Sequence, residues 1–126
     1  MKVEVYHLVA DETCSAVVQT EQLDLRERIT WESDRAAIAA VWRGLDKQLW
    51  YHHVAVLEIK GNDELEVAEE AWRVTNHIDE SWNLNPEVLS CDVTARSSNV
   101  GDVFVLYTED GIKTYFAATC GFGLLY

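Results

Sequence analysis

The chain opens with alternating polar and apolar residues. Lys2-Val3-Glu4-Val5 begins a run, residues 2–9, in which successive side chains belong to opposite faces, as in a half-buried β-strand. Residues 14–21 alternate in the same way. With residues 10–13 as the connector, the two runs are predicted to pair as a hairpin.

Residues 36–45 are predicted to form an amphipathic helix. Their apolar side chains recur at positions i, i+3, i+4 and i+7: Ile38, Val41, Trp42 and Leu45. Thr30 or Ser33 can cap this helix, and Asp34 is favourably placed against its N-terminal dipole.

A second helix is predicted from Glu64 to about Ile78, capped by Asn62 or Asp63. Its glutamates and Arg73 share one side, where Glu69 and Arg73 have the spacing of an i,i+4 ion pair. The other, wide side is mostly apolar: Leu65, Val67, Ala68, Ala71, Trp72, Val74, Thr75 and Ile78.

The remaining apolar runs are predicted strands. Residues 54–59 are apolar on both faces, which is typical of a central strand covered on both sides. Residues 79–91 are predicted to be a loop. Asp110-Gly111 indicates a tight turn between two C-terminal strands. Such a turn would pair Glu109 with Ile112, Tyr107 with Thr114, and Val105 with Phe116.

The order of these elements, ββ-α-β-α-ββ, predicts a single α+β domain over residues 1–126. Hairpins and isolated helices, rather than repeated βαβ units, favour a mostly antiparallel sheet of about five strands with two helices packed on it. The sequence contains no internal repeat and no low-complexity linker.

Charge restricts the partners that we expect. The chain has 22 acidic residues and 10 Lys or Arg, for a net charge of −12. Such a surface is repelled by nucleic acid and by anionic membranes, and it favours basic proteins. Solubility alone is the simpler explanation of the charge. Three widely spaced cysteines and Met1-Lys2-Val3-Glu4, which lacks an apolar leader, predict a reducing, cytoplasmic location.

Signatures of catalysis, of metal sites and of cofactor sites are missing from the sequence. His52 and His53 are adjacent, so in a strand they point to opposite faces and do not share a metal ion. Cys120 stands among glycines, where a buried apolar thiol is the simpler interpretation than a nucleophile. Residues 97–102 have the composition of a turn. We therefore predict no catalytic residue, no metal and no cofactor. An enzyme that uses Cys120 or His53 in an unrecognised site is kept as a third hypothesis, after the two binding hypotheses given below.

The C-terminal part of the chain resembles a group of small proteins carried by phages, plasmids and integrated elements, the YodL-like group. The resemblance rests on Arg96-Ser97-Ser98-Asn99-Val100-Gly101-Asp102-Val103, followed by Tyr115-Phe116-Ala117 and Gly121-Phe122. Members of the group often read Arg-Ser-x-Ser-Val-Gly-Asp-Val, and Asn99 stands where Ser is usual. The resemblance covers about residues 65–125. It implies a mobile-element origin and supplies no catalytic residue.

The leading hypothesis is a non-enzymatic binding protein of a phage or similar element. It would inhibit a basic, nucleic-acid-binding host protein of a defence system by electrostatic mimicry. The residues predicted to meet that partner are Glu64, Glu66, Glu69, Glu70, Glu109 and Asp110. The alternative is a module that sequesters a small ligand or nucleotide, and it could be homo-oligomeric. Its predicted ligand-binding residues are Trp50, Tyr51 and Trp82, with Arg96 or Arg43 on an anion.

Overall fold

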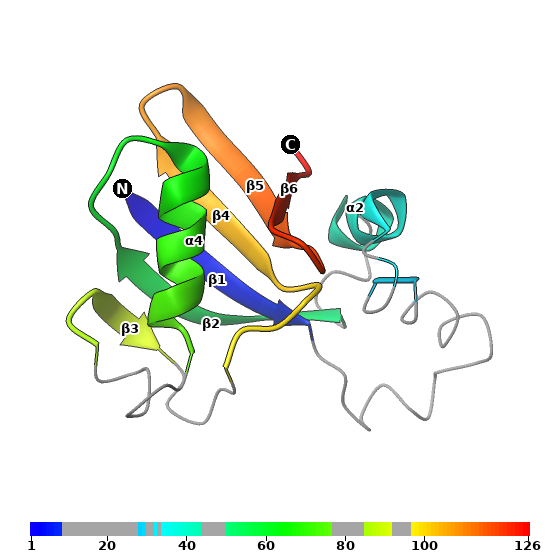
Figure 1. Ribbon diagram of the computed structural model, residues 1–126, viewed down its shortest axis with the longest axis horizontal. Helices are drawn as coiled ribbons and strands as arrows, with labels where there is room; N and C mark the ends of the chain where they lie inside the picture. Colours follow the sequence, from blue (N-terminus) through cyan, green and yellow to red (C-terminus); the bar gives the residue numbers. More distant parts are fainter. Residues whose placement is uncertain (9–27, 30–31, 33, 44–49, 77–84, 92–96) are drawn as a thin grey trace.

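A computed structural model describes residues 1–8, 28–29, 32, 34–43, 50–76, 85–91 and 97–126 (Figure 1). In these ranges the chain forms six strands and two helices. Their order is β1 (Lys2–Leu8), α2 (Arg35–Arg43), β2 (Tyr51–Glu58), α4 (Glu64–Val74), β3 (Val88–Cys91), β4 (Val103–Thr108), β5 (Gly111–Ala117) and β6 (Phe122–Leu124). The fold is α+β with an antiparallel sheet, as predicted, and has one strand more than the pattern indicated.

The six strands form one sheet in the order β3-β2-β1-β4-β5-β6. Strand β1 pairs with β2 along one edge, from Lys2–Glu58 to Leu8–Tyr51, and with β4 along the other. The predicted hairpin between residues 2–9 and 14–21 is therefore wrong for β1, because both of its edges are occupied. Residues 14–21 lie outside the described residues. Alternation identifies a strand and its buried face, but it carries no information about the neighbouring strand.

The C-terminal hairpin has a different register from the predicted one. Thr108 pairs with Gly111, Tyr107 with Ile112, and Val105 with Thr114, so Glu109 and Asp110 form the turn. The Thr108 hydroxyl accepts a hydrogen bond from the Asp110 amide at 3.2 Å and donates one to the Gly111 carbonyl at 2.7 Å. Because the shift is two residues, each side chain keeps its predicted face.

Strand β3 and strand β6 form the two edges of the sheet. Residues 88–91, predicted as part of a loop, pair with β2, and residues 122–124 pair with β5. A strand of three or four residues shows too little alternation to be recognised, and it depends on its neighbour for its conformation.

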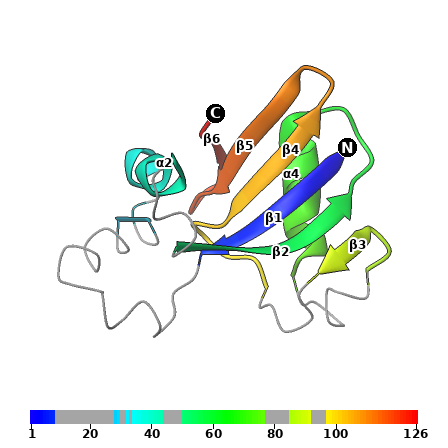
Figure 2. The same ribbon diagram turned by 180° about the vertical axis from the view of Figure 1, so that it is seen from behind.

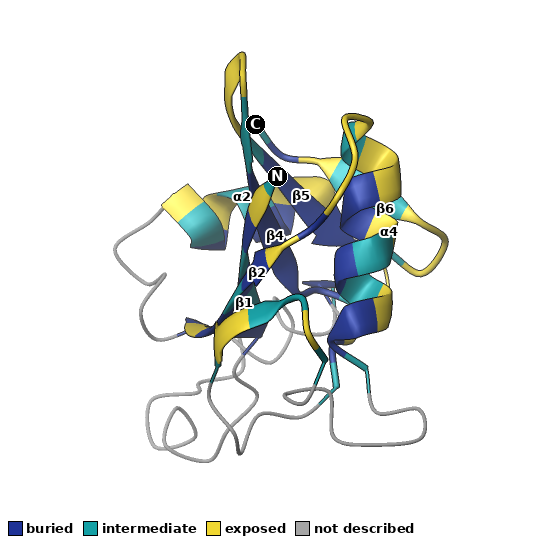
Figure 3. Cartoon of the chain, turned by 90° about the vertical axis from the view of Figure 1, so that its left-hand side faces the viewer, coloured by how far each residue is buried: buried dark blue, intermediate teal, exposed yellow. Residues whose placement is uncertain are grey.

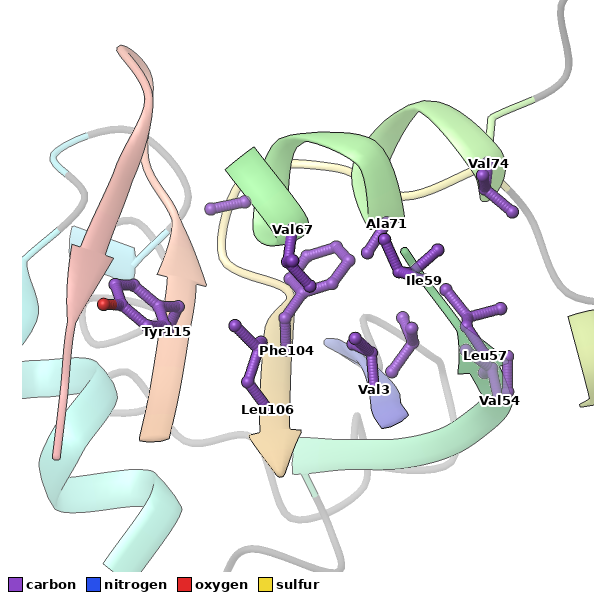
Figure 4. Close-up of a cluster of buried hydrophobic side chains, with 13 residues drawn as sticks. Val3, Val54, Leu57, Ile59, Val67, Ala71, Val74, Phe104, Leu106 and Tyr115 are labelled. Carbon is purple, nitrogen blue, oxygen red and sulfur yellow. The ribbon is translucent and has the colours of Figure 1, made fainter. Parts of the chain in front are cut away.

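Helix α4 covers one face of the sheet (Figures 1 and 3). Asp63 is its N-cap and accepts a hydrogen bond from the Glu66 amide at 3.0 Å. Figure 4 shows Val67 and Ala71 projecting from α4 toward Phe104 and Ile59, in a core where these four side chains are at most 1% exposed. The helix ends at Val74, earlier than predicted, with Thr75 as its C-cap.

Two predictions for α4 need correction. Leu65, assigned to the apolar side, is 50% exposed, because it lies at the margin of the buried stripe. Arg73 bonds Glu70 and not Glu69: its Nε donates to both Glu70 carboxylate oxygens at 3.0 Å. Positions i,i+3 and i,i+4 are both neighbours on a helix surface, and spacing alone does not choose between them.

Helix α2 lies beside the β5–β6 end of the sheet (Figures 1 and 2). Asp34 is its cap, accepting from the amides of Ala36 at 3.0 Å and Ala37 at 3.2 Å. Arg35 donates to the carbonyls of Leu124 at 2.7 Å and Leu125 at 2.9 Å. These bonds attach α2 to the C-terminal strand over a second core cluster, whose buried members include Leu8, Ile38, Val41, Val103 and Phe116.

Candidate functional site

The Gly101-Asp102 part of the C-terminal motif is a structural junction. Asp102 is fully buried, and its carboxylate accepts the Leu8 amide at 2.7 Å and the Asn99 amide at 2.6 Å. Backbone pairing between β1 and β4 stops at Tyr6–Val103, so this carboxylate replaces the next backbone acceptor. Tyr51 donates to the Gly101 carbonyl at 2.7 Å. Burial, with the nearby Asp102 charge, raises the pKa of Tyr51.

A second set of buried polar groups lies beside Asp102. The Ser98 hydroxyl is 3.1 Å from His7 Nε2 and 2.6 Å from the Thr75 hydroxyl, and the Ser98 amide donates to the Thr75 carbonyl at 3.0 Å. His7 Nε2 is also 3.7 Å from Asp102 Oδ2. The same ring nitrogen faces both serine and aspartate. The set therefore lacks the serine–histidine–aspartate order in which each imidazole nitrogen serves a different partner. Through Ser98, these hydrogen bonds join His7 of β1 to Thr75 at the end of α4.

The acidic surface contains a groove between α4 and the β2–β3 edge of the sheet. We call it the acidic groove. Its volume is about 720 Å³, and it is lined by Glu58, Ile59, Lys60, Glu66, Glu70, Pro86, Glu87 and Leu89. Four carboxylates and one ammonium group thus line the groove. Two of these carboxylates form ion pairs within the chain, Glu58 with the N-terminal ammonium of Met1 at 3.1 Å and Glu70 with Arg73. The volume lies within the range of about 300–1,000 Å³ that ligand-binding pockets occupy.

Arg73, on the same helix, forms an ion pair with Glu70. Arg73 donates to Glu70, and this bond lowers the pKa of the Glu70 carboxyl. The same bond, with a smaller contribution from Glu87, raises the pKa of Arg73. Glu70 is therefore ionised, and Arg73 balances part of its negative charge.

The predicted partner-binding acids fall into three places. Glu66 and Glu70 line the acidic groove, and Glu69 is exposed on the same helix. Glu64 accepts a hydrogen bond from the Tyr115 hydroxyl at 2.9 Å. The exposed pair Glu109 and Asp110 forms the tip of the β4–β5 hairpin, at the same end of the molecule as the start of α4 (Figures 1 and 3).

Of the predicted small-ligand residues, the structure describes Trp50, Tyr51 and Arg43, and it buries the two aromatic side chains. Trp50 is 8% exposed and belongs to the second core cluster. Tyr51 is also buried, and Arg43 lies over the Tyr126 ring at 3.5 Å from its centre. Arg96 and Trp82 lie outside the described residues, so their ligand role stays a prediction.

Glu58, Glu87 and Leu89 are groove residues that sequence reasoning missed. Glu58 is the last residue of β2, eight positions before Glu66, whereas Glu87 and Leu89 lie beside or in β3, 17 or more positions after Glu70. For Glu87 and Leu89 the local signal is Pro86 followed by Glu87-Val88-Leu89, and that signal indicates a turn into a short strand. The approach of these residues to α4 is a tertiary event.

Among the described residues, no three or more His, Cys, Asp or Glu side chains are grouped so as to hold a metal ion. His52 and His53 are both exposed, and they pair with His7 and Tyr6, respectively, on opposite faces of β1. Cys120 is exposed as a free thiol, not buried as the simpler interpretation expected. Within the ranges that the structure describes, no helix is long and apolar enough to cross a membrane.

Comparison with protein-family models, with curated proteins and with solved structures found no match to this chain.

Proposed function

We propose that the protein is a non-enzymatic binder that presents the exposed acids of α4 and the acidic groove to a basic protein. The partner is a protein that normally uses Lys and Arg to hold nucleic acid, and the binder occupies that surface by electrostatic mimicry. The mobile-element setting and the role against a host defence component are part of the proposal, and they rest on the resemblance of residues 65–125 described above.

The observation that supports this proposal best is the concentration of carboxylates along one edge of the molecule. Glu66, Glu69 and Glu70 lie within two turns of α4, and Glu58 and Glu87 face that helix across the groove. A pair of like charges at i,i+4, such as Glu66 and Glu70, destabilises a helix by a few tenths of a kcal/mol. Acids in the first turn also complement the helix dipole, which accounts for Glu64 and Glu66 but not for Glu69 or Glu70.

Charge-based binding should be strongly dependent on salt. At about 1 M salt the Debye length falls to about 3 Å, so exposed carboxylates no longer attract a basic surface across water. Affinity capture from a bacterial lysate over a salt series tests this expectation directly. A partner retained equally at low and at about 1 M salt contradicts the mechanism.

Three variants locate the interaction. Glu66→Gln with Glu69→Gln removes two exposed charges from α4 and should reduce the affinity for the captured partner by about tenfold or more, as expected for charges in a complementary interface. Glu109→Gln with Asp110→Asn removes the same charge from the hairpin tip and shows whether that tip belongs to the same surface. Glu32→Gln, exposed and outside the site, is the control and should bind normally.

The result that refutes localisation on α4 is a helix variant that binds as well as the Glu32→Gln control. Losses in proportion to the charge removed, two charges in each double variant and one in Glu32→Gln, would show that net charge alone governs binding. Circular dichroism and urea unfolding of each variant confirm that the substitutions leave the fold intact, as expected for surface changes of about 0.5 kcal/mol or less.

A further inference from the structure

The acidic groove contains an exposed apolar side chain, Leu89. This residue is 63% exposed, although it belongs to a strand. Val88 pairs with Leu57 and Ser90 with Val56, so Leu89 is the additional residue of a β-bulge between these pairs. A bulge redirects the side chain that it carries. Val88 and Cys91, the first and last residues of the strand, pack against the core, whereas Leu89 lines the groove.

The walls of the groove are held in place by backbone and side-chain hydrogen bonds. The Glu58 amide donates to the Glu87 carbonyl at 2.9 Å, and the Val88 amide donates to the Asn85 carbonyl at 3.1 Å. The Asn85 side chain donates to the Val74 carbonyl at 2.7 Å, which attaches this turn to the end of α4. A groove that is already formed needs little ordering when it binds a partner.

Apolar surface and charge therefore occur together in one recess. The exposed side chains of Leu89 and Pro86 supply the apolar part, and four carboxylates, two of them ion-paired within the chain, supply the charge. Hydrophobic burial contributes affinity that salt does not screen, whereas the carboxylates contribute orientation and a salt-dependent attraction.

We infer that the acidic groove binds a segment of the partner protein in which one apolar side chain is flanked by Lys or Arg. The apolar side chain packs against Leu89 and Pro86, and the flanking cations meet Glu66, Glu87 and their neighbours. The segment docks through its side chains and not as an added strand, because β3 is short and bulged, two features that disfavour pairing at a sheet edge. The inference rests on the proposed function and specifies the chemistry of its partner.

Two fluorescent peptides provide the probe. One has the sequence Lys-Lys-Leu-Arg-Lys, and in the other Ser replaces Leu, so both carry the same charge. Binding is measured by fluorescence anisotropy with the whole protein and with Leu89→Ala. Leu65→Ala is the matched control, because Leu65 is 50% exposed on α4 but does not line the groove.

The expected result is selective. Leu89→Ala weakens binding of the leucine peptide by about tenfold and leaves the serine peptide unchanged, and Leu65→Ala changes neither. Glu66→Gln with Glu87→Gln weakens both peptides and reduces their salt dependence. Backbone amide NMR shifts on adding the leucine peptide should concentrate at residues 58–60, 66–70 and 86–89.

Two results overturn the inference, and they differ in what they imply. If the glutamate variant loses binding but Leu89→Ala binds both peptides as the native protein does, the groove inference is wrong and the proposed function stands. If neither peptide binds in a salt-dependent way and the α4 variants still capture the natural partner, the proposed function is wrong as well.

Discussion

Replacing Asp102 should destabilise the fold by several kcal/mol. Its buried carboxylate accepts two backbone amides, from Leu8 at 2.7 Å and from Asn99 at 2.6 Å. The same residue joins β5 through its backbone, since its carbonyl accepts the Ala117 amide at 2.9 Å. Asp102 thus connects the end of β1, the turn before β4 and the end of β5.

The magnitude follows from the two side-chain hydrogen bonds. Each hydrogen bond to a charged group contributes about 1.5–3 kcal/mol, so Asp102→Ala should cost about 3–6 kcal/mol. The Asp102→Asn side chain keeps one carbonyl oxygen, which can accept from one of the two backbone amides. Its NH2 group then faces the other backbone amide, donor against donor. This variant should cost about 1–3 kcal/mol, because one buried amide loses its partner. The total free energy of unfolding of a domain of this size is about 5–15 kcal/mol.

Urea unfolding followed by tryptophan fluorescence measures both variants. Asp102→Asn is included because Asp102→Ala could fail to fold, and Asp110→Asn, at an exposed turn, is the control and should lie within about 0.5 kcal/mol of the native protein. If Asp102→Asn were as stable as that control, or more damaging than Asp102→Ala, the assignment of two amide bonds to this carboxylate would be wrong.

Three further predictions concern packing and pH. Gly123→Ala places a methyl group in the Phe116 ring and should cost about 1–3 kcal/mol; the cost should be smaller in a Phe116→Leu background, as a double-mutant cycle would show, and an equal cost would contradict the overlap. Gly101→Ala is strained at φ +91°, and its Cβ would lie 3.0 Å from Ile29 Cγ2. Gly111→Ala is also strained, at φ +125°, but its Cβ meets no atom within 4 Å. Gly101→Ala should therefore lower the urea midpoint more than Gly111→Ala does, and equal midpoints would refute the steric argument. Burial and the hydrogen bond to Glu64 raise the pKa of Tyr115 from 10.0 to about 12. The contribution of the neutral Tyr115 hydroxyl to stability is therefore complete below pH 10 and disappears as the pH rises through about 12. The native protein should be more stable than Tyr115→Phe below pH 10 and should lose this advantage between pH 10 and about 12. An advantage that persists at higher pH would contradict the role of the hydroxyl.

Local features of the sequence were sufficient to identify most of the elements. The cap at Asp63, the apolar stripe of α4 and the alternation of β1 all depend on residues within a few positions of one another. The α+β class followed from the order of these elements. The helix acids Glu66, Glu69 and Glu70 were also recognised as an exposed, charged face on periodicity alone, and the structure places them on the outside of α4.

The tertiary structure decided which segments meet. Strand β1 takes β2 and β4 as neighbours, Asp102 reaches Leu8 across 94 positions, and Glu58 and Glu87 complete a groove that Glu66 and Glu70 begin. Periodicity determines which face of an element is buried, because that face depends only on neighbouring residues. Partners distant in the chain are selected by the burial of whole faces against one another, and no local spacing records that choice.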